Sequence, residues 1–270
     1  MLQLLAIDGP FDPNHRLQTS WALPPLLFGL VRLLFSVYIF QYLFYRIAYS
    51  AVTDGGLLAG QSFSYFTNIT YWSLGFYFAF AGFHTVIYAL RGTAPLQRWP
   101  KALQFMHALF YSSITTFSFL VTIVYWGILA DTDYPFLTTV SGYSNVSGHL
   151  LNSVFAFFEV AIARTERPPW IHLPLLVLFL AGYLAVAYIT YATQGFYTYA
   201  FLNPATGNGK VTAYCFGIVA AICIVFAVVW LLIWARLVVT EKYLGAKGKF
   251  SSRDRGRGGD GKGAAEVSKV

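Results

Sequence analysis

Long apolar segments alternate with short polar segments along most of the chain. Each apolar segment is close to the ~20 residues that an α-helix needs to cross a bilayer, and none holds more than two charged residues. Strands of a membrane barrel would instead alternate in segments of about ten residues. The pattern predicts an all-α fold, a polytopic membrane helix bundle with six transmembrane helices in a domain spanning residues 21–240. The six segments are roughly 24–48, 63–90, 103–130, 146–163, 171–193 and 211–238.

Proline and the first residues of the chain agree with this division. The prolines lie at the edges of the apolar segments, as at Pro24, Pro25 and Pro174, or between them, which is typical of continuous helices. Residues 1–20 contain Asp8 and only a short apolar patch, which argues against a cleaved signal peptide. We therefore expect residues 1–20 to form an N-terminal arm.

Composition narrows the class of protein further. Hydrophobic residues make up 57% of the 270 residues and charged residues only 11%, against about 25% charged in an ordinary soluble domain. This balance excludes a soluble globular enzyme and a disordered protein. Two cysteines are too few for a disulfide scaffold or a four-cysteine zinc site. We expect no metal, no cofactor and no nucleic-acid partner, because nucleic-acid binding needs a higher density of basic residues.

The basic residues lie almost entirely on one side of the predicted membrane. Fifteen of the 18 lysines and arginines fall in the N-terminal arm, the 91–101 and 164–169 connections and the region after residue 235. The other connections hold only Lys210, while Arg32 and Arg46 lie within the first segment. Because connections rich in Lys and Arg stay cytoplasmic, both termini are predicted to be cytoplasmic. The membrane itself is an endomembrane, such as the endoplasmic reticulum, or the plasma membrane.

The last thirty residues, 241–270, are basic and rich in glycine. Such a segment cannot bury a core, so we expect a disordered cytoplasmic tail. It would keep the chain soluble and fix its orientation, or attract anionic lipid, or contact RNA through its Arg-Gly dipeptides.

Ionisable residues inside a bilayer are costly, so each one is a candidate for function. The predicted topology places Arg32, His84, His107 and Glu159 in the inner half of the membrane. They form a candidate inner polar network. It is either a structural cluster in which Arg32 compensates Glu159 or part of a pathway for protons or ions.

A second group of polar residues lies at the outer face. Thr67 is close to the start of the second segment, where free N–H groups and the helix dipole favour a developing negative charge. His149 is predicted at a similar depth, so the two could form a nucleophile and its base. Asn152 follows His149 by three residues and is expected on the same helix face, and Asn68 follows Thr67. Either amide could stabilise an oxyanion.

Two fragments carry a resemblance to a known family. The segments SYFTNITYWSLGFYF (64–78) and SGHLLNSVFAFFE (147–159) resemble the androgen-induced-protein family, also called FAR-17a-like. Its studied members are multi-pass membrane threonine hydrolases that cleave fatty acid esters of hydroxy fatty acids. The resemblance implies Thr67 as nucleophile and His149 as base, with Glu159 ten residues after the histidine. Membrane lipids and a lipid ester substrate are the partners it implies.

Other readings remain open. The fragment YFTNITYW and the six-segment layout also resemble the rolling-stone family of membrane proteins, which has no assigned reaction. A non-catalytic protein of that type, a transporter and a b-type cytochrome are the alternatives. A transporter usually has helix breaks near the midplane, which the proline positions do not suggest. A cytochrome could hold at most one haem at the inner face, since only His149 is predicted at the outer one.

Overall fold

The computed structural model describes residues 10–130 and 136–254 of the chain. In these two ranges the regular elements are helices, and the β contacts are two isolated bridges. The all-α fold expected from the sequence is therefore confirmed for this part of the chain.

Five helices are long and apolar enough to cross a membrane. They correspond to five of the six expected spans. Two of them continue at their C-terminal ends as π-helical segments. The length of apolar helix available to cross the membrane includes these segments. In chain order the elements are α1 (Pro25–Thr53), α3 (Phe66–Arg91), α4 (Lys101–Val124) with η2 (Tyr125–Leu129), α7 (His172–Gln194), and α8 (Asn208–Leu237) with η6 (Val238–Tyr243).

The remaining expected span, 146–163, belongs to a helical run that starts earlier and is more polar. The run consists of α5 (Thr139–Val146), the π-helical segment η3 (Ser147–Leu151) and α6 (Asn152–Ile162). It is not one of the five helices that are apolar enough to cross a membrane. The polar side chains of His149, Asn152 and Glu159 interrupt its apolar sequence.

The ends of the long helices follow local rules. Pro25 occupies the first position of α1, where its missing N–H costs nothing. Gly92 and Gly195 end α3 and α7 in the left-handed conformation, which glycine adopts without steric cost. Short elements lie in the connections: α2 (Leu57–Ser62), η1 (Pro95–Arg98), η4 (Ala200–Leu202) and η5 (Pro204–Thr206).

Helices α1 and α3 pack closely against each other because small residues line their contact. A Cβ added at Gly29 would meet Val86, and one added at Gly82 would meet Leu33. The hydroxyl of Ser36 donates to the carbonyl of Gly75 across the same interface, at 2.9 Å. Small residues allow this approach between helices in a membrane, where van der Waals packing replaces the hydrophobic drive of water.

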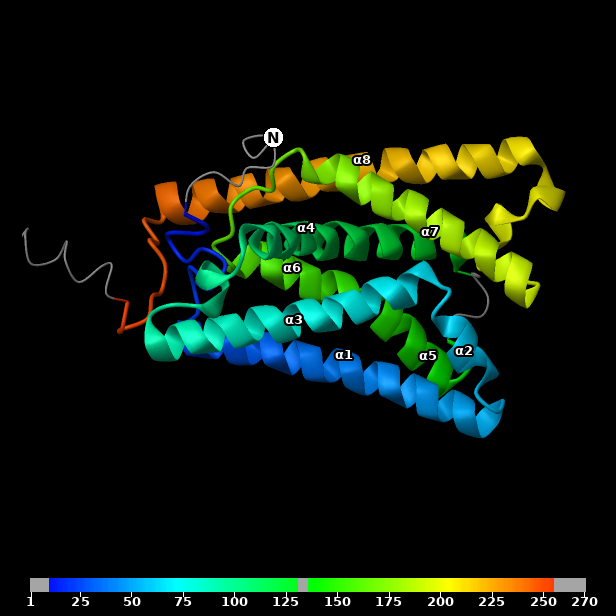
Figure 1. Ribbon diagram of the computed structural model, residues 1–270, viewed down its shortest axis with the longest axis horizontal. Helices are drawn as coiled ribbons and strands as arrows, with labels where there is room; N and C mark the ends of the chain where they lie inside the picture. The colour runs from blue at the N-terminus through cyan, green and yellow to red at the C-terminus, as the bar shows by residue number, and fades with distance from the viewer. Residues whose placement is uncertain (1–9, 131–135, 255–270) are drawn as a thin grey trace, which may run out of the picture.

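The long helices run along the long axis of the molecule and define two ends (Figure 1). One end, which we call the basic end, holds the described N-terminal residues, η1, the 163–171 connection and the described C-terminal residues. Ser20 forms a bridge to Ala163 and another to Lys249, so these three segments meet there. The other end, which we call the opposite end, holds α2, the start of α5 and the connection between α7 and α8.

Ion pairs and backbone contacts tie the N-terminal arm to the C-terminal residues at the basic end. Arg16 pairs with Glu166 at 3.0 Å and with Glu241 at 2.8 Å. Ser251 is buried, and its hydroxyl donates to the carbonyl of Ala89 at 2.9 Å. Of the expected tail 241–270, residues 241–254 therefore contact the bundle, and residues 255–270 lie outside the described residues.

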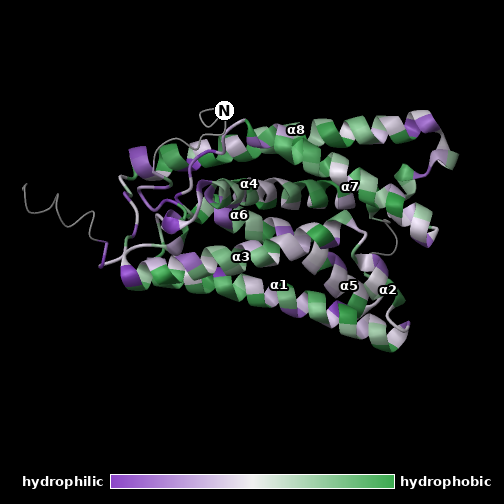
Figure 2. Ribbon diagram, viewed as in Figure 1, coloured by the Kyte–Doolittle hydropathy of each residue, from purple (hydrophilic) through white to green (hydrophobic). Residues whose placement is uncertain are grey.

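Apolar side chains cover much of the outer surface of the long helices (Figure 2). Leu34, Val37, Phe216 and Ile224 are each more than 60% exposed in the isolated chain. Exposed apolar surface on this scale is rare on soluble monomers and is typical of a surface that faces another apolar phase. This surface and the five apolar helices are compatible with an integral membrane protein.

Candidate functional site

A polar cavity of about 370 Å³ lies at the opposite end of the bundle. It brings together Thr67 and His149, which the sequence placed at a similar depth, and also Asn68. These residues come from the first turn of α3 and from the π-helical segment η3. The wider lining includes Tyr42, Arg46, Tyr49, Asp54, Gln61, Tyr65, Trp72, Tyr125, Leu129, Ser144, Asn145 and Tyr199.

Thr67 is the second residue of α3. The first backbone bond of the helix runs from the N–H of Ile69 to the carbonyl of Tyr65, at 3.1 Å. The N–H groups of Phe66, Thr67 and Asn68 therefore have no partner inside the helix, which is the usual state of a helix N-terminus. They carry the positive end of the helix dipole next to the Thr67 hydroxyl.

The hydroxyl groups of Thr67 and Thr70 differ in their surroundings. The hydroxyl of Thr70 donates back to the helix, at 2.9 Å from the carbonyl of Phe66 and 3.0 Å from that of Thr67. Such back-bonding is common for threonine in a helix. Thr67 instead presents its side chain to the cavity. Of the two threonines, Thr67 is the one whose side chain lines the cavity, beside Tyr199.

His149 lies in the middle of η3, a π-helical segment of the kind often found at functional sites. Its backbone carbonyl accepts hydrogen bonds from the Thr122 hydroxyl at 2.7 Å and the Trp126 indole at 3.3 Å. Its imidazole stacks on the ring of Tyr125. The Nδ1 atom is buried and has no hydrogen-bond partner among the residues that the structure describes. The ring is therefore oriented by stacking and by the backbone of η3 rather than by a described carboxylate.

The two asparagine candidates occupy different places. Asn68 lines the cavity, and its amide donates to the carbonyl of Ser62 at 3.0 Å. Asn152 is buried, and its oxygen accepts from the Thr122 hydroxyl at 2.9 Å and the Ser153 N–H at 2.6 Å. Asn152 is not part of the cavity lining. A π-helical turn holds more residues than an α-helical one, so an offset of three residues from His149 no longer returns to the same face.

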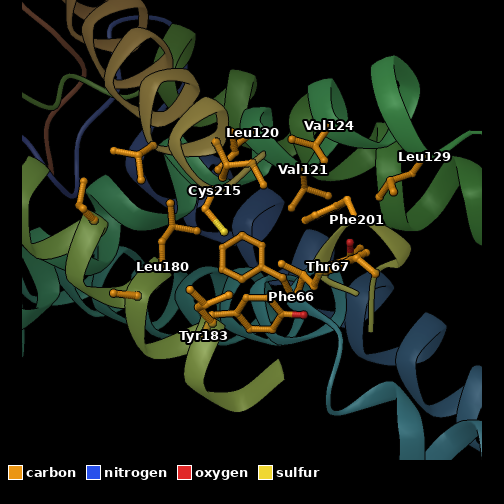
Figure 3. Close-up of a pocket in the computed structure, with 17 residues that line it drawn as sticks. Phe66, Thr67, Leu120, Val121, Val124, Leu129, Leu180, Tyr183, Phe201 and Cys215 are labelled. Carbon is orange, nitrogen blue, oxygen red and sulfur yellow. The ribbon is translucent and has the colours of Figure 1, made fainter. Parts of the chain in front are cut away.

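A second, apolar cavity of about 200 Å³ adjoins the polar one. Three residues line both cavities: Thr67, Leu129 and Tyr199. Figure 3 shows Thr67 toward the Leu129 side of the apolar cavity, with the rings of Phe66 and Tyr183 along one wall and Cys215 and Leu180 farther away. An apolar cavity of ~150 Å³ is large enough to hold benzene. The apolar cavity therefore has room for part of an acyl chain.

Tyr199 is a residue of this site that the sequence analysis missed. It follows α7 in the connection to α8, and it lines both cavities. Burial raises the pKa of its phenol, while hydrogen bonds with the Thr67 side chain and from the N–H groups of Thr67 and Phe66 partly offset this rise. Its hydroxyl therefore stays protonated near neutral pH beside Thr67. No sequence pattern near residue 199 predicts that the connection between α7 and α8 lies against the start of α3.

The inner candidates also come together, nearer the basic end. Arg32 and Glu159 form a fully buried ion pair, with Arg32 Nε donating to Glu159 Oε2 at 3.1 Å and Nη2 to Oε1. Arg32 Nη1 donates to the Thr85 hydroxyl at 2.6 Å and to the carbonyl of Leu17 at 2.8 Å. The Tyr77 hydroxyl donates to Glu159 at 3.0 Å. Both charges are thus compensated by opposite charge and by hydrogen bonds, as a structural network requires.

The two histidines of the inner group lie beside this ion pair. The rings of His84 and His107 are 5.9 Å apart, and His107 stacks on Tyr77 at 5.8 Å. Both ring nitrogens of His84 are buried without a hydrogen-bond partner among the described residues. In residues 10–130 and 136–254, no group of three or more His, Cys, Asp or Glu side chains is arranged to hold a metal ion.

Comparisons of the sequence with models of protein families and with curated proteins, and of the structure with solved structures, found no match. The fold and the two adjoining cavities therefore carry the functional argument.

Proposed function

We propose that the chain crosses the membrane six times, with both termini in the cytoplasm. The five apolar helices and the more polar helical run 139–162, formed by α5, η3 and α6, give the six crossings. The bridges from Ser20 to Ala163 and Lys249 hold the two ends of the described chain at the basic end, as an even number of crossings requires. The basic residues of that end make it the cytoplasmic side. The membrane is an endomembrane such as the endoplasmic reticulum, or the plasma membrane.

We further propose that the protein hydrolyses a lipid ester, with Thr67 as nucleophile and His149 as general base. One observation carries this proposal: Thr67 lines both a polar cavity that contains His149 and an apolar cavity beside it. An ester of a lipid has a polar part and an acyl chain on either side of its carbonyl carbon. Thr67 stands where that carbon would lie if each part occupied the matching cavity.

The reaction follows from these positions. His149 takes the proton of the Thr67 hydroxyl as the oxygen bonds to the ester carbonyl carbon. The negative charge that develops on the carbonyl oxygen is stabilised by the N–H groups at the start of α3, which have no partner inside the helix and lie beside the Tyr199 hydroxyl. The C–O bond to the alcohol breaks, and His149 returns the proton to the alcohol. Water then attacks the acyl-threonine with the help of His149, which releases the fatty acid and restores Thr67.

The supporting residues have separate roles in this proposal. The protonated hydroxyl of Tyr199, beside Thr67, adds a donor for the oxyanion. Asn68 holds the first turn of α3 to the carbonyl of Ser62, which keeps the N–H groups in place. Asn152 acts at a distance, because it holds Thr122 and so the η3 backbone that carries His149. The resemblance to the androgen-induced-protein family points to the same two central residues and to fatty acid esters of hydroxy fatty acids, or similar lipids, as substrates.

A fluorophosphonate probe tests the assignment directly, because it forms a covalent bond with an activated hydroxyl. Membranes that contain the full-length protein should be labelled, and labelling should be lost in Thr67→Ala and His149→Gln. Thr67→Ser should retain it. Thr70→Ala is the matched control, since that hydroxyl is bonded to the helix backbone, and it should be labelled like the unmodified protein. Labelling that persists in Thr67→Ala would overturn the assignment.

A further inference from the structure

The polar cavity contains two opposite charges that the proposed reaction does not use. Arg46, on α1, is one of its lining residues, and so is Asp54, just after α1 ends. Arg46 Nη1 donates to the Ser144 hydroxyl at 3.0 Å. This single bond leaves the other N–H groups of the guanidinium, which has five in all, for a ligand in the cavity. Among the described residues no carboxylate lies within salt-bridge distance of Arg46.

Only one of the two carboxylate oxygens of Asp54 has a hydrogen-bond partner among the described residues. Its Oδ1 accepts from the Ser50 hydroxyl at 2.7 Å and from the N–H of Leu58 at 3.3 Å, which caps α2. Its Oδ2 is buried and has no hydrogen-bond partner among the described residues. The hydrogen bond from Ser50, with smaller contributions from the N–H groups of Leu58, Gly56 and Leu57, lowers the pKa of Asp54, so the carboxylate is ionised. A buried oxygen of an ionised carboxylate is costly unless it meets a donor or a cation.

Aromatic rings belong to the same lining as these two charges. Tyr42, Tyr65 and Trp72 line the same cavity. A cation placed over the face of such a ring is attracted by its quadrupole, and aromatic residues with a carboxylate are the usual surroundings of a bound quaternary ammonium. The cavity therefore offers a site for an anion at Arg46 and a site for an organic cation near Asp54.

We propose that this cavity binds the zwitterionic headgroup of a single-chain phospholipid, with its phosphate at Arg46 and its ammonium at Asp54 and the aromatic rings. This inference rests on the proposed hydrolysis of a lipid ester, and it puts a single-chain phospholipid in place of the fatty acid ester that the resemblance implies. The paired charges of the cavity match a headgroup that carries both signs, whereas a purely anionic lipid would meet the carboxylate of Asp54. The adjoining apolar cavity takes the beginning of the one acyl chain.

The position of Thr67 agrees with such a ligand. In a single-chain phospholipid the ester lies between the glycerol phosphate and the acyl chain, and Thr67 lies between the two cavities. Hydrolysis of that ester consumes one water and yields a free fatty acid and a glycerophospho headgroup. The acid leaves through the apolar cavity and the headgroup through the polar one.

Binding can be tested without turnover in full-length protein that carries Thr67→Ala. The protein, in a neutral maltoside detergent, is mixed with equal amounts of lysophosphatidylcholine, lysophosphatidate and monoacylglycerol of the same chain length. Native mass spectrometry then counts each bound lipid. We expect one bound lysophosphatidylcholine, preferred at least tenfold over monoacylglycerol. Arg46→Gln should abolish this preference, and Asp54→Asn should shift it toward lysophosphatidate.

Two further variants control for charge and for folding. Lys210→Gln removes an exposed base at the same end that does not line the cavity, so it should leave the preference unchanged. Arg46→Lys keeps the positive charge and should retain part of the preference if Arg46→Gln does not fold. Equal binding of the three lipids, a preference for lysophosphatidate in the parent protein, or a preference untouched by Asp54→Asn would overturn the inference. Failure of fluorophosphonate labelling would remove the hydrolase and leave this binding result standing.

Discussion

The imidazole of His149 lies parallel to the phenol ring of Tyr125, with ring centroids 3.5 Å apart and 3° between the planes. Tyr125 begins the π-helical segment η2, and His149 is the central residue of η3. Both π-helical segments therefore meet at this stack. In a triad a carboxylate usually orients the base, whereas here a flat aromatic contact sets the plane of the ring.

Replacing Tyr125 should therefore impair His149 without touching the nucleophile. Tyr125→Leu removes the stacking surface, and we expect the rate of fluorophosphonate labelling at Thr67 to fall by about 10- to 100-fold, the usual cost of a misplaced catalytic group. Tyr125→Phe keeps the ring and should stay within about threefold of the unmodified rate, since the ring and not its hydroxyl makes the contact. A Tyr125→Phe loss as large as that of Tyr125→Leu would assign the effect to the hydroxyl instead.

The Arg32–Glu159 pair should show strong energetic coupling. Glu159→Leu leaves a buried guanidinium without a compensating negative charge and should lower the free energy of unfolding by about 3–5 kcal/mol. Arg32→Met/Glu159→Leu removes both charges and should cost less than the sum of the single changes. Thermal unfolding of the purified protein and its three variants in detergent measures this. Additive costs would contradict the role of the pair as one structural unit.

Asp12 should make the docking of the N-terminal arm depend on pH. Although its side chain keeps some accessible surface, burial raises the pKa of Asp12 to about 7, against opposing hydrogen bonds from the N–H groups of Leu17 and Arg16. Because the folded pKa lies above the unfolded value, the native state binds the extra proton. Its stabilising effect is complete below about pH 4 and is lost as pH rises through 7. Hydrogen exchange of residues 12–20 should accelerate from pH 5 to 8 after correction for intrinsic rates, and Asp12→Asn should flatten this change.

Gly92 should hold the C-terminal residues against the basic end. Its φ is +77°, and a Cβ there would collide with the backbone of Arg253. Gly92→Ala therefore adds about 1–2 kcal/mol of backbone strain and displaces residues 251–254. Trypsin should cut after Arg253 at least several-fold faster in this variant. Gly209→Ala, where a Cβ meets open space, should be cut like the unmodified protein; equal rates in the two variants would show that the contact does not protect the segment.

The sequence was sufficient to predict the helices that depend on an uninterrupted apolar segment and on local backbone sterics. Five helices follow from apolar segments longer than the bilayer core, and their glycine and proline ends follow from backbone sterics. The run 139–162 was harder to delimit, because polar residues dilute its apolar character and it begins at Thr139 rather than near 146. Its length depends on packing against neighbouring helices, which no local pattern records.

The depth of the candidate site residues along their helices was predictable from the sequence, but the direction in which their side chains point was not. Depth along a helix follows from residue number, so Thr67 and His149 could be placed at one level, and they line one cavity. The side of a helix on which a residue lies depends on the number of residues per turn. After the π-helical turn of η3, Asn152 contacts Thr122 instead of lining the cavity. Tyr199 and Arg46 enter the site through tertiary contacts alone. A loop that returns to a helix start leaves no periodic signal in the sequence.

The apolar cavity should set the acyl chain length that the protein accepts. Cys215 lies on its lining, away from Thr67, so Cys215→Trp should fill that part and leave the space next to Thr67 open (Figure 3). With esters of one headgroup, we expect KM for long chains to rise about tenfold or more while KM for chains of a few carbons stays within about twofold, because only the long chain reaches the filled part. Phe216→Trp is the matched control, since Phe216 is the next residue on α8, is 70% exposed and does not line the cavity. If Cys215→Trp changes short and long chains alike, the acyl chain does not lie in this cavity.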